Sequence, residues 1–290
     1  MASIALCGIV KDEIHAIVEW LAYYKALRFT DFVIYDNEST DGTSDILRVL
    51  DEAGELVHLD WSHDVGQRPQ RLAYDHARRY SEADWLAFFD ADEFLALRAD
   101  ASIDSFLGRF DADVGAIAIN WRVFGSSGQQ HYRPAPVIER FTDALPEDAR
   151  LHLTVKSIAR RAGLRGNWVH RVKIGDGRYV TPSGRDASFL NTRAAREQDM
   201  SVATIHHYAI KSMEEYAIKR LRGDANGQSQ AERRTRLDEG FASNDAGGVQ
   251  NDDLARKSGP MRAEAMRLCG ILREAGLSFP VWPFIEVDRP

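Results

Sequence analysis

Short apolar runs alternate with amphipathic segments through the N-terminal third of the chain. Short runs bounded by turn residues are typical of buried strands, whereas apolar residues recurring every three or four positions indicate helices. This strict alternation predicts an α/β fold with a mainly parallel central sheet and helices on both faces. The expected strands are Ile4–Val10, Asp31–Asp36, Leu56–Leu59 and a run beginning at Trp85, and the expected helices are Lys11–Leu27, Ser44–Leu50 and Gln67–Tyr80.

Later segments predict one long strand and a helical C-terminal part. Ala116–Phe124 has the pattern of a strand, and His206 and His207 follow an apolar run as they would at a strand end. The apolar, proline-rich segment Phe279–Phe284 is expected to lie across the body of the protein. Helices are expected at Met213–Leu221, Glu232–Leu237 and Met261–Ala275, with a polar loop at Gly223–Gln230.

Three carboxylates follow the apolar run that begins at Trp85. Asp90, Asp92 and Glu93 come directly after it, and in open α/β sheets the ligand crevice lies outside the carboxyl ends of the strands. Acidic side chains gathered there repel one another unless a proton or a cation neutralises them. Their oxygen ligands suit Mg²⁺ or Mn²⁺ holding a substrate diphosphate. The alternative is that these acids only end the strand and cap a following helix.

The second strand also ends in an acid. Asp36 is followed by Asn37, Ser39 and a helix N-terminus, which places several hydrogen-bonding groups beside the same sheet edge. Asp36 is therefore a candidate to accept a hydrogen bond from a base or a ribose hydroxyl, and a well-capped turn is the alternative. The chain contains neither a G-x-G-x-x-G turn after its first strand nor a P-loop motif, so it gives no support to a dinucleotide site or a P-loop.

Composition and charge narrow the class of protein. With 290 residues, 44% of them hydrophobic and 28% charged, the chain is long enough for one large α/β domain with an appendage. Its net charge of −7 argues against a nucleic-acid partner. Cys7 and Cys269 both fall on apolar patterns and are expected in the core. Without a signal peptide or an apolar stretch of membrane-spanning length, a cytoplasmic location is expected.

Several motifs occur in one collinear order along the chain. Such an order is far more specific than a single acidic motif. The motifs are Lys11-Asp12-Glu13, Glu19-Trp20-Leu21, Tyr35-Asp36-Asn37-Glu38-Ser39-Thr40-Asp41, Phe89-Asp90-Ala91-Asp92-Glu93-Phe94-Leu95, Trp121-Arg122-Val123-Phe124-Gly125, Val137-Ile138-Glu139-Arg140-Phe141, Lys156-Ser157-Ile158, Val169-His170, and His206-His207-Tyr208 with Lys219 after it. This order resembles the family-2-type glycosyltransferases, most closely the branch related to glycosyltransferase family 92. The family pattern has Asn where this chain has Asp12 and His206, which leaves His207 in register.

The resemblance implies a GT-A fold over residues 1–223. Residues 1–97 would form the nucleotide-sugar half and residues 98–223 the acceptor half, with a helical extension at 224–290 packed on the same body. The implied reaction moves a sugar from a nucleotide-diphosphate donor to an acceptor hydroxyl of a carbohydrate, with inversion. No nucleic-acid partner and no transmembrane segment are expected.

The resemblance also implies roles for individual residues. Donor-binding residues would be Asp36, Asn37 and Ser39 around the nucleoside, together with Lys11, Asp90 and Lys156. Asp90, Asp92 and His207 would hold Mn²⁺ or Mg²⁺, which makes Asp92 a catalytic residue. For His207 the alternative is a hydrogen-bonded structural histidine, and for Lys156 a solvated surface charge.

An inverting reaction also needs a carboxylate that deprotonates the acceptor hydroxyl. Glu139 is the candidate because apolar neighbours on both sides could bury it in part and raise its pKa. The alternative is a structural ion pair with a basic residue such as Lys156.

Two other functions remain open at this point. A phosphohydrolase of the haloacid dehalogenase type would use Asp90 and Asp92, but its acidic motif normally ends the first strand and this one ends the fourth. A non-catalytic carbohydrate-binding relative is the other alternative. The sequence leaves open the donor sugar, the acceptor and the oligomeric state.

Overall fold

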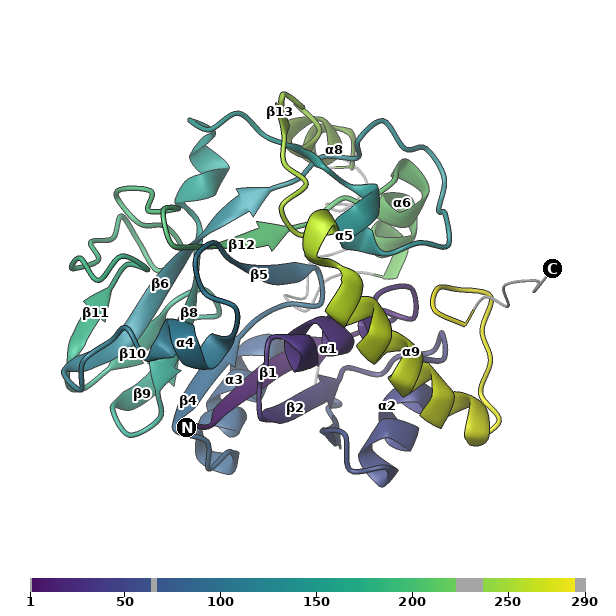
Figure 1. Ribbon diagram of the computed structural model, residues 1–290, viewed down its shortest axis with the longest axis horizontal. Coiled ribbons are helices and arrows are strands. Elements are labelled where there is room, and N and C mark those ends of the chain that lie inside the picture. Colours follow the sequence, from purple (N-terminus) through teal and green to yellow (C-terminus); the bar gives the residue numbers. More distant parts are fainter. Residues whose placement is uncertain (1, 64–66, 223–236, 285–290) are drawn as a thin grey trace.

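A nine-stranded mixed sheet forms the centre of the computed structural model, which describes residues 2–63, 67–222 and 237–284 (Figure 1). Its strands follow the order β3-β2-β1-β4-β8-β6-β12-β5, with β11 paired to β6. They are β1 (Ile4–Val10), β2 (Asp31–Asp36), β3 (Val57–Asp60), β4 (Trp85–Phe88), β5 (Glu93–Leu97), β6 (Val114–Val123), β8 (Val155–Arg160), β11 (Arg178–Val180) and β12 (Ala203–His207).

The predicted parallel arrangement holds for the N-terminal half of the sheet. β1, β2, β3 and β4 pair in parallel, which confirms the α/β class. The other half is mixed, because β8 lies antiparallel between β4 and β6 and β5 runs antiparallel to β12. The acidic triplet leads into strand β5 and not into a helix. Every residue of β5 is buried, and burial of apolar side chains such as Phe94 and Leu95 explains why a strand and not a helix follows the triplet.

Side chains of the parallel strands alternate between two apolar cores, as the period of two in a strand requires. Ile4 and Leu6 of β1 pack with α1 (Ile17–Ala26), α2 (Thr43–Glu52) and α9 (Gly259–Glu274). Ala5 and Cys7 face the opposite way and pack with α3 (Pro69–Tyr80). Helices therefore cover both faces, and the carboxyl ends of the strands are left for the loops.

The first helix begins at Ile17 and not at Lys11, where the apolar pattern placed its start. The intervening loop is held instead by the loop after β2. The backbone N–H of Asp12 donates to Ser39 Oγ at 2.9 Å, and the N–H of Ile14 donates to Asp41 Oδ2 at 2.9 Å. Asp12 has a positive φ of 49°, which Asn and Asp tolerate better than most residues. Two loops at the carboxyl edge of the sheet are thereby joined into one wall.

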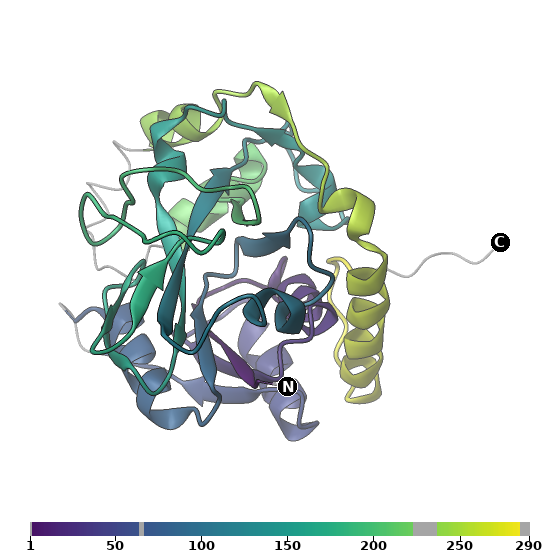
Figure 2. The ribbon, with the colours of Figure 1, turned by 60° about the vertical axis from the view of Figure 1, so that its left-hand side comes forward.

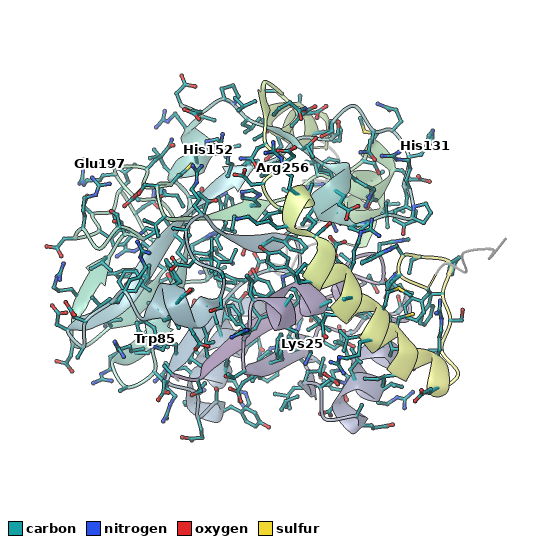
Figure 3. The ribbon with its side chains drawn as sticks, in the orientation of Figure 1. Lys25, Trp85, His131, His152, Glu197 and Arg256 are labelled. Atoms are coloured by element: carbon teal, nitrogen blue, oxygen red, sulfur yellow. The ribbon has the colours of Figure 1, made fainter. Side chains whose placement is uncertain are left out.

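Ion pairs attach the C-terminal helix α9 to α1 and to the loop after α2. α9 lies against α1 on one side of the sheet (Figure 2). Glu55, in the loop after α2, accepts from Lys25 of α1 at 2.8 Å and from Arg267 of α9 at 2.5 Å (Figure 3, where Lys25 is labelled). Beyond α9 the buried side chains of Val281 and Phe284 hold the tail on the body. The predicted loop at Gly223–Gln230 and all but the last residue of the predicted helix Glu232–Leu237 lie outside the described residues.

The remaining elements are short or peripheral. They are α4 (Ile103–Leu107), α5 (Val137–Arg140), α6 (Met213–Arg222), α8 (Leu237–Asn244), β7 (Asp143–Ala144), β9 (Leu164–Asn167), β10 (Val172–Ile174), β13 (Val249–Gln250) and the 3₁₀ helices η1 (Arg150–Leu153) and η2 (Ala255–Lys257). None of the helices in the described ranges combines the length and the apolar character needed to cross a bilayer.

A buried glutamate joins α1 to the short helix α5. Glu19 of α1 accepts hydrogen bonds from the backbone N–H groups of Val137 at 2.7 Å and Ile138 at 3.2 Å. Burial raises the pKa of Glu19 from 4.5 to about 7, although these two hydrogen bonds favour the ionised form.

The raised pKa of Glu19 leads to a test of stability against pH. Between about pH 4.5 and pH 7 the native state binds a proton that the unfolded chain lacks, so the free energy of unfolding falls as pH rises through this window. Glu19→Gln cannot ionise. We expect the wild type to lose up to about 3 kcal/mol relative to this variant between pH 4.5 and pH 8 in urea titrations. If the unfolding free energies of the wild type and Glu19→Gln changed in parallel with pH, the prediction would be wrong, and Glu19 would already be ionised in the native protein at pH 5.

Candidate active site

The acidic triplet forms a tight turn between β4 and β5. The N–H of Glu93 donates to the carbonyl of Asp90 at 3.0 Å, and Glu93 Oε2 accepts from the N–H of Asp90 at 2.9 Å. The flanking Phe89 and Phe94 are buried and anchor the turn at both ends. The three carboxylates therefore leave the sheet from one fixed turn, and they point to different partners.

Asp90 and Glu93 are turned towards a buried lysine. Lys156 of β8 has a fully buried side chain, and its Nζ lies 3.1 Å from Asp90 Oδ2 and 3.3 Å from Glu93 Oε2. The other Asp90 oxygen, Oδ1, accepts from Gln70 at 2.6 Å and from Tyr74 at 2.9 Å, both on α3. Lys156 thus places a buried positive charge between Asp90 and Glu93. Sequence reasoning placed it instead where a diphosphate could touch it, and its burial does not fit that position.

Burial and charge act in opposite directions on this group. Burial raises the pKa of Glu93 well above its usual range in spite of Lys156, and the neighbouring Asp90 and Asp92 add to this effect. Burial alone would lower the pKa of Lys156, but Asp90 and Glu93 outweigh it and raise the pKa. Lys156 consequently stays charged beside its two carboxyl groups.

Asp92 points to the other side of the turn, towards β12 and α6. Its Oδ1 lies 3.6 Å from His207 Nε2, and its Oδ2 accepts from Lys219 of α6. Burial alone would raise the pKa of Asp92, but the charge of Lys219 and the neighbouring His207 hold it well below its usual range. Asp92 is therefore an ionised carboxylate at neutral pH.

His207 has the properties of a metal ligand. Burial lowers its pKa to about 4 against the opposing effect of Asp92, so the ring is neutral at pH 7. Two adjacent ligands of a six-coordinate divalent cation lie about 3 Å apart, and the 3.6 Å between Asp92 Oδ1 and His207 Nε2 needs only a small adjustment. These two residues fit a divalent cation.

Asp90 does not lie together with Asp92 and His207, although the three were predicted to hold one cation. Among the described residues, these three do not form a group with one ligand atom each within 4.8 Å of one another. The reason is that Lys156, Gln70 and Tyr74 hold both oxygens of Asp90 on the opposite side of the turn.

The predicted nucleoside residues gather at the carboxyl end of β2. Asp36 is buried, and its Oδ1 accepts from the N–H of Ser39 at 3.1 Å while its Oδ2 accepts from Ser44. Asn37 is also buried, and its Oδ1 has no hydrogen-bond partner among the described residues. A buried acceptor without a partner costs free energy that a bound donor group would recover. Lys11 follows β1 directly and so lies at the same edge.

Strand register places the two groups of residues at the ends of β2 and β4, with β1 between them. Val10 of β1 is paired with Asp36, and Cys7 is paired with Phe88 of β4, two residues before Asp90. Asp36 and Asp90 consequently flank β1, about 10 Å apart at a strand spacing of about 4.8 Å. A nucleoside lying at Asp36 would direct its phosphates towards the acidic turn.

Several contacts at this site were not expected from sequence. Trp121 of β6 is buried, donates from Nε1 to Glu93 Oε1 at 2.9 Å and lies against the ring of His207, with centroids 3.9 Å apart. Lys219 was noted only as part of a motif. His206, the neighbour of His207, packs in the core against Phe124. The alternation of side chains along β12 explains why the two histidines face opposite ways.

Glu139 lies apart from the acidic turn in its contacts. Its carboxylate on α5 accepts from Arg262 of α9, with Nε to Oε1 at 2.6 Å. Partial burial alone would raise the pKa of Glu139, but hydrogen bonds from Arg262 and Ser258 outweigh it and lower the pKa. The prediction of a raised pKa is therefore wrong, and the structural ion pair is the better interpretation, with Arg262 in place of Lys156.

Glu139→Gln should consequently leave turnover almost unchanged. We expect a loss of stability below about 1 kcal/mol, because both partners are partly exposed and such pairs contribute little. Urea denaturation and steady-state kinetics on the same preparation would measure both effects, with Arg262→Gln as the matched partner variant. A hundredfold fall in kcat at unchanged stability would return Glu139 to the role of base.

The sequence pattern of one protein family spans most of this chain. The pattern of glycosyltransferase family 92 matches residues 3–243. This chain belongs to glycosyltransferase family 92. The parallel half of the sheet confirms the predicted α/β fold, and the family match confirms the predicted family. The match also extends past residue 223, where the main domain was predicted to end.

Other proteins with family 92 names are similar to this chain over part of their length. A glycosyltransferase family 92 protein of Oryza sativa subsp. japonica is 23% identical over 194 residues, which is 65% of this chain and 32% of the rice protein. One from Ricinus communis is 23% identical over 218 residues, 74% of this chain and 36% of that protein. The family 92 chain thus spans about a third of the length of these relatives.

Solved structures with a similar course of the chain are distant. The mannosyltransferase PcManGT from Pyrobaculum calidifontis, in complex with GDP-Man and Mn²⁺, has a TM-score of 0.43 and 15% identity, covering 96% of this chain and 77% of its own. TarS from S. aureus, residues 1–349, has a TM-score of 0.40 and 14% identity, covering 93% and 83%.

Proposed function

We propose that this family 92 chain transfers a sugar from a nucleoside-diphosphate donor to an acceptor hydroxyl, with a divalent cation and with inversion. The observation that carries the proposal is the register at the carboxyl edge of the sheet. Asp36 lies on one side of β1, and the turn with Asp90 and Asp92 lies on the other. One elongated anionic ligand can reach both groups.

Each part of the edge has a chemical task in this proposal. Asp36 and Asn37 Oδ1, which finds no partner in the described part of the chain, accept hydrogen bonds from the nucleoside. Asp92 and neutral His207 hold Mn²⁺ or Mg²⁺, which when bound neutralises charge on the departing diphosphate. Lys219 holds the second oxygen of Asp92 and so fixes the orientation of its carboxylate.

Lys156 has a different task in the same proposal. It holds Asp90 and Glu93 together from inside the protein, so that only one carboxylate of the triplet faces the cation. This arrangement keeps the acidic turn rigid without leaving three unpaired charges beside a diphosphate.

Slow hydrolysis of donors tests the proposal without knowledge of the acceptor. Several nucleotide sugars would be incubated with the chain, with Mn²⁺ and with EDTA, and release of the nucleoside diphosphate would be measured. We expect one donor to be cleaved at least tenfold faster with Mn²⁺. The absence of both cleavage and binding for all donors, or cleavage of a phosphomonoester instead, would contradict a glycosyltransferase.

Binding of the nucleoside can be tested separately at Asp36. Asp36→Ala should weaken the binding of the preferred nucleoside diphosphate by about 1.5–3 kcal/mol, because a charged acceptor is lost. Titration calorimetry would measure this change. Asp31→Asn is the matched control, since Asp31 lies at the opposite, exposed end of the same strand. Unchanged affinity in Asp36→Ala would remove Asp36 from the nucleoside site.

A further inference from the structure

A second group of possible metal ligands lies beside Asp36, at the carboxyl ends of β2 and β3. Asp36 is paired with Asp60 and Ile34 with His58 in the parallel ladder. Because residues two apart in a strand share a face, Asp36, His58 and Asp60 all point to the same side of the sheet. One ligand atom from each lies within 4.8 Å of the other two.

One ring nitrogen of His58, Nε2, lies at the centre of this group. Its side chain is only 10% exposed, and Nε2 is buried with no hydrogen-bond partner among the described residues. Nε2 lies 3.9 Å from Asp36 Oδ2 and 3.8 Å from Asp60 Oδ1, too far for hydrogen bonds. A buried nitrogen without a partner, aimed between two carboxylates, is in the position of a metal ligand.

The spacing suits a four-coordinate cation. Neighbouring ligand atoms of tetrahedral Zn²⁺ lie about 3.4 Å apart for bonds of about 2.1 Å, so the observed separations require shifts of only about half an ångström. Asp36 is fixed by hydrogen bonds from Ser39 and Ser44, as the outer partners of metal ligands usually are. Asp60 can make the adjustment because its side chain is 95% exposed.

We propose that Asp36, His58 and Asp60 bind a divalent transition-metal ion of the Zn²⁺ type, at a site separate from Asp92 and His207. The spacing of four-coordinate ligands favours Zn²⁺ over Mg²⁺ and Ca²⁺, which take six or more ligands. Three protein ligands leave one coordination position for water or a small ligand. The site shares Asp36 with the nucleoside of the proposed function, so Zn²⁺ and the donor exclude each other. This consequence rests on the proposed function, whereas the binding of Zn²⁺ does not.

Calorimetric titration with Zn²⁺ tests the site directly. His207→Gln serves as the background, because it weakens the other candidate site. We expect one Zn²⁺ to bind in this background, with an affinity that falls at least about tenfold when Asp60→Asn or His58→Gln is added. Asp60→Asn changes a side chain that is 95% exposed, so we expect the variant to keep its fold. Asp51→Asn, an exposed carboxylate of α2, is the control and should change nothing.

Two results would overturn the proposal. One is the absence of Zn²⁺ binding to the His207→Gln background at micromolar concentrations, and the other is unchanged affinity in both added variants. Because the readout is binding of the ion alone, a chain inactive on every nucleotide sugar could still confirm the site. Donor cleavage without Zn²⁺ binding would leave the glycosyltransferase proposal intact.

Discussion

Asp92→Asn should reduce donor cleavage by at least about a thousandfold, which corresponds to about 4 kcal/mol of lost transition-state stabilisation. Asp92 is the ionised carboxylate that lies next to neutral His207, and asparagine keeps its shape without its charge. The proposed site would then lose its charged ligand and keep only neutral ones. Release of the nucleoside diphosphate measures turnover, and electron paramagnetic resonance of Mn²⁺ measures binding of the ion independently of activity.

The control for Asp92→Asn is another buried, ion-paired aspartate. Asp100 is as little exposed as Asp92, 8% in each case, and it pairs with Arg109 beyond the far end of β5. Asp100→Asn should lower stability and leave both turnover and Mn²⁺ binding unchanged. Wild-type turnover in Asp92→Asn would end the assignment of the acidic turn to the cation, whatever the effect of Asp100→Asn.

Much of the fold could be predicted because its strands carry local signals. Ile4–Val10 is an apolar run, Asp31–Asp36 encloses an apolar run between two aspartates, and both strands have the predicted bounds. The start of α1 could not be predicted in the same way, because tertiary hydrogen bonds from Asp12 and Ile14 to the loop after β2 decide it. Local periodicity contains no information on such contacts.

In the candidate site, too, local patterns identify residues but not the contacts between distant parts of the chain. Asp92 and His207 could be named from motifs because both lie next to strands: Asp92 directly precedes β5, and His207 is the last residue of β12. Their separation depends on the antiparallel pairing of β5 with β12, which places His207 opposite Glu93. The division of the triplet between Lys156 and His207 depends on where β8 and α6 lie, and no pattern within the triplet indicates it. The lowered pKa of Glu139 could not be predicted for the same reason, since its partner Arg262 is far away in the sequence.

Lys156→Met should lower the free energy of unfolding by about 3–5 kcal/mol. Lys156 has no exposed area and lies between Asp90 and Glu93, within 3.3 Å of both. Methionine fills much of the same space but leaves the two carboxyl groups facing each other without a cation. Urea denaturation would measure the loss, and circular dichroism would show whether the variant is folded.

A double variant separates the loss of charge from the loss of packing. Lys156→Met/Glu93→Gln removes one of the two carboxyl groups that the lysine neutralises, so part of the lost stability should return. We expect a coupling energy of about 1–3 kcal/mol between the two positions, as for other residues in direct contact. Coupling near zero would mean that Lys156 serves Asp90 alone, and it would limit the role of Lys156 to one side of the acidic turn.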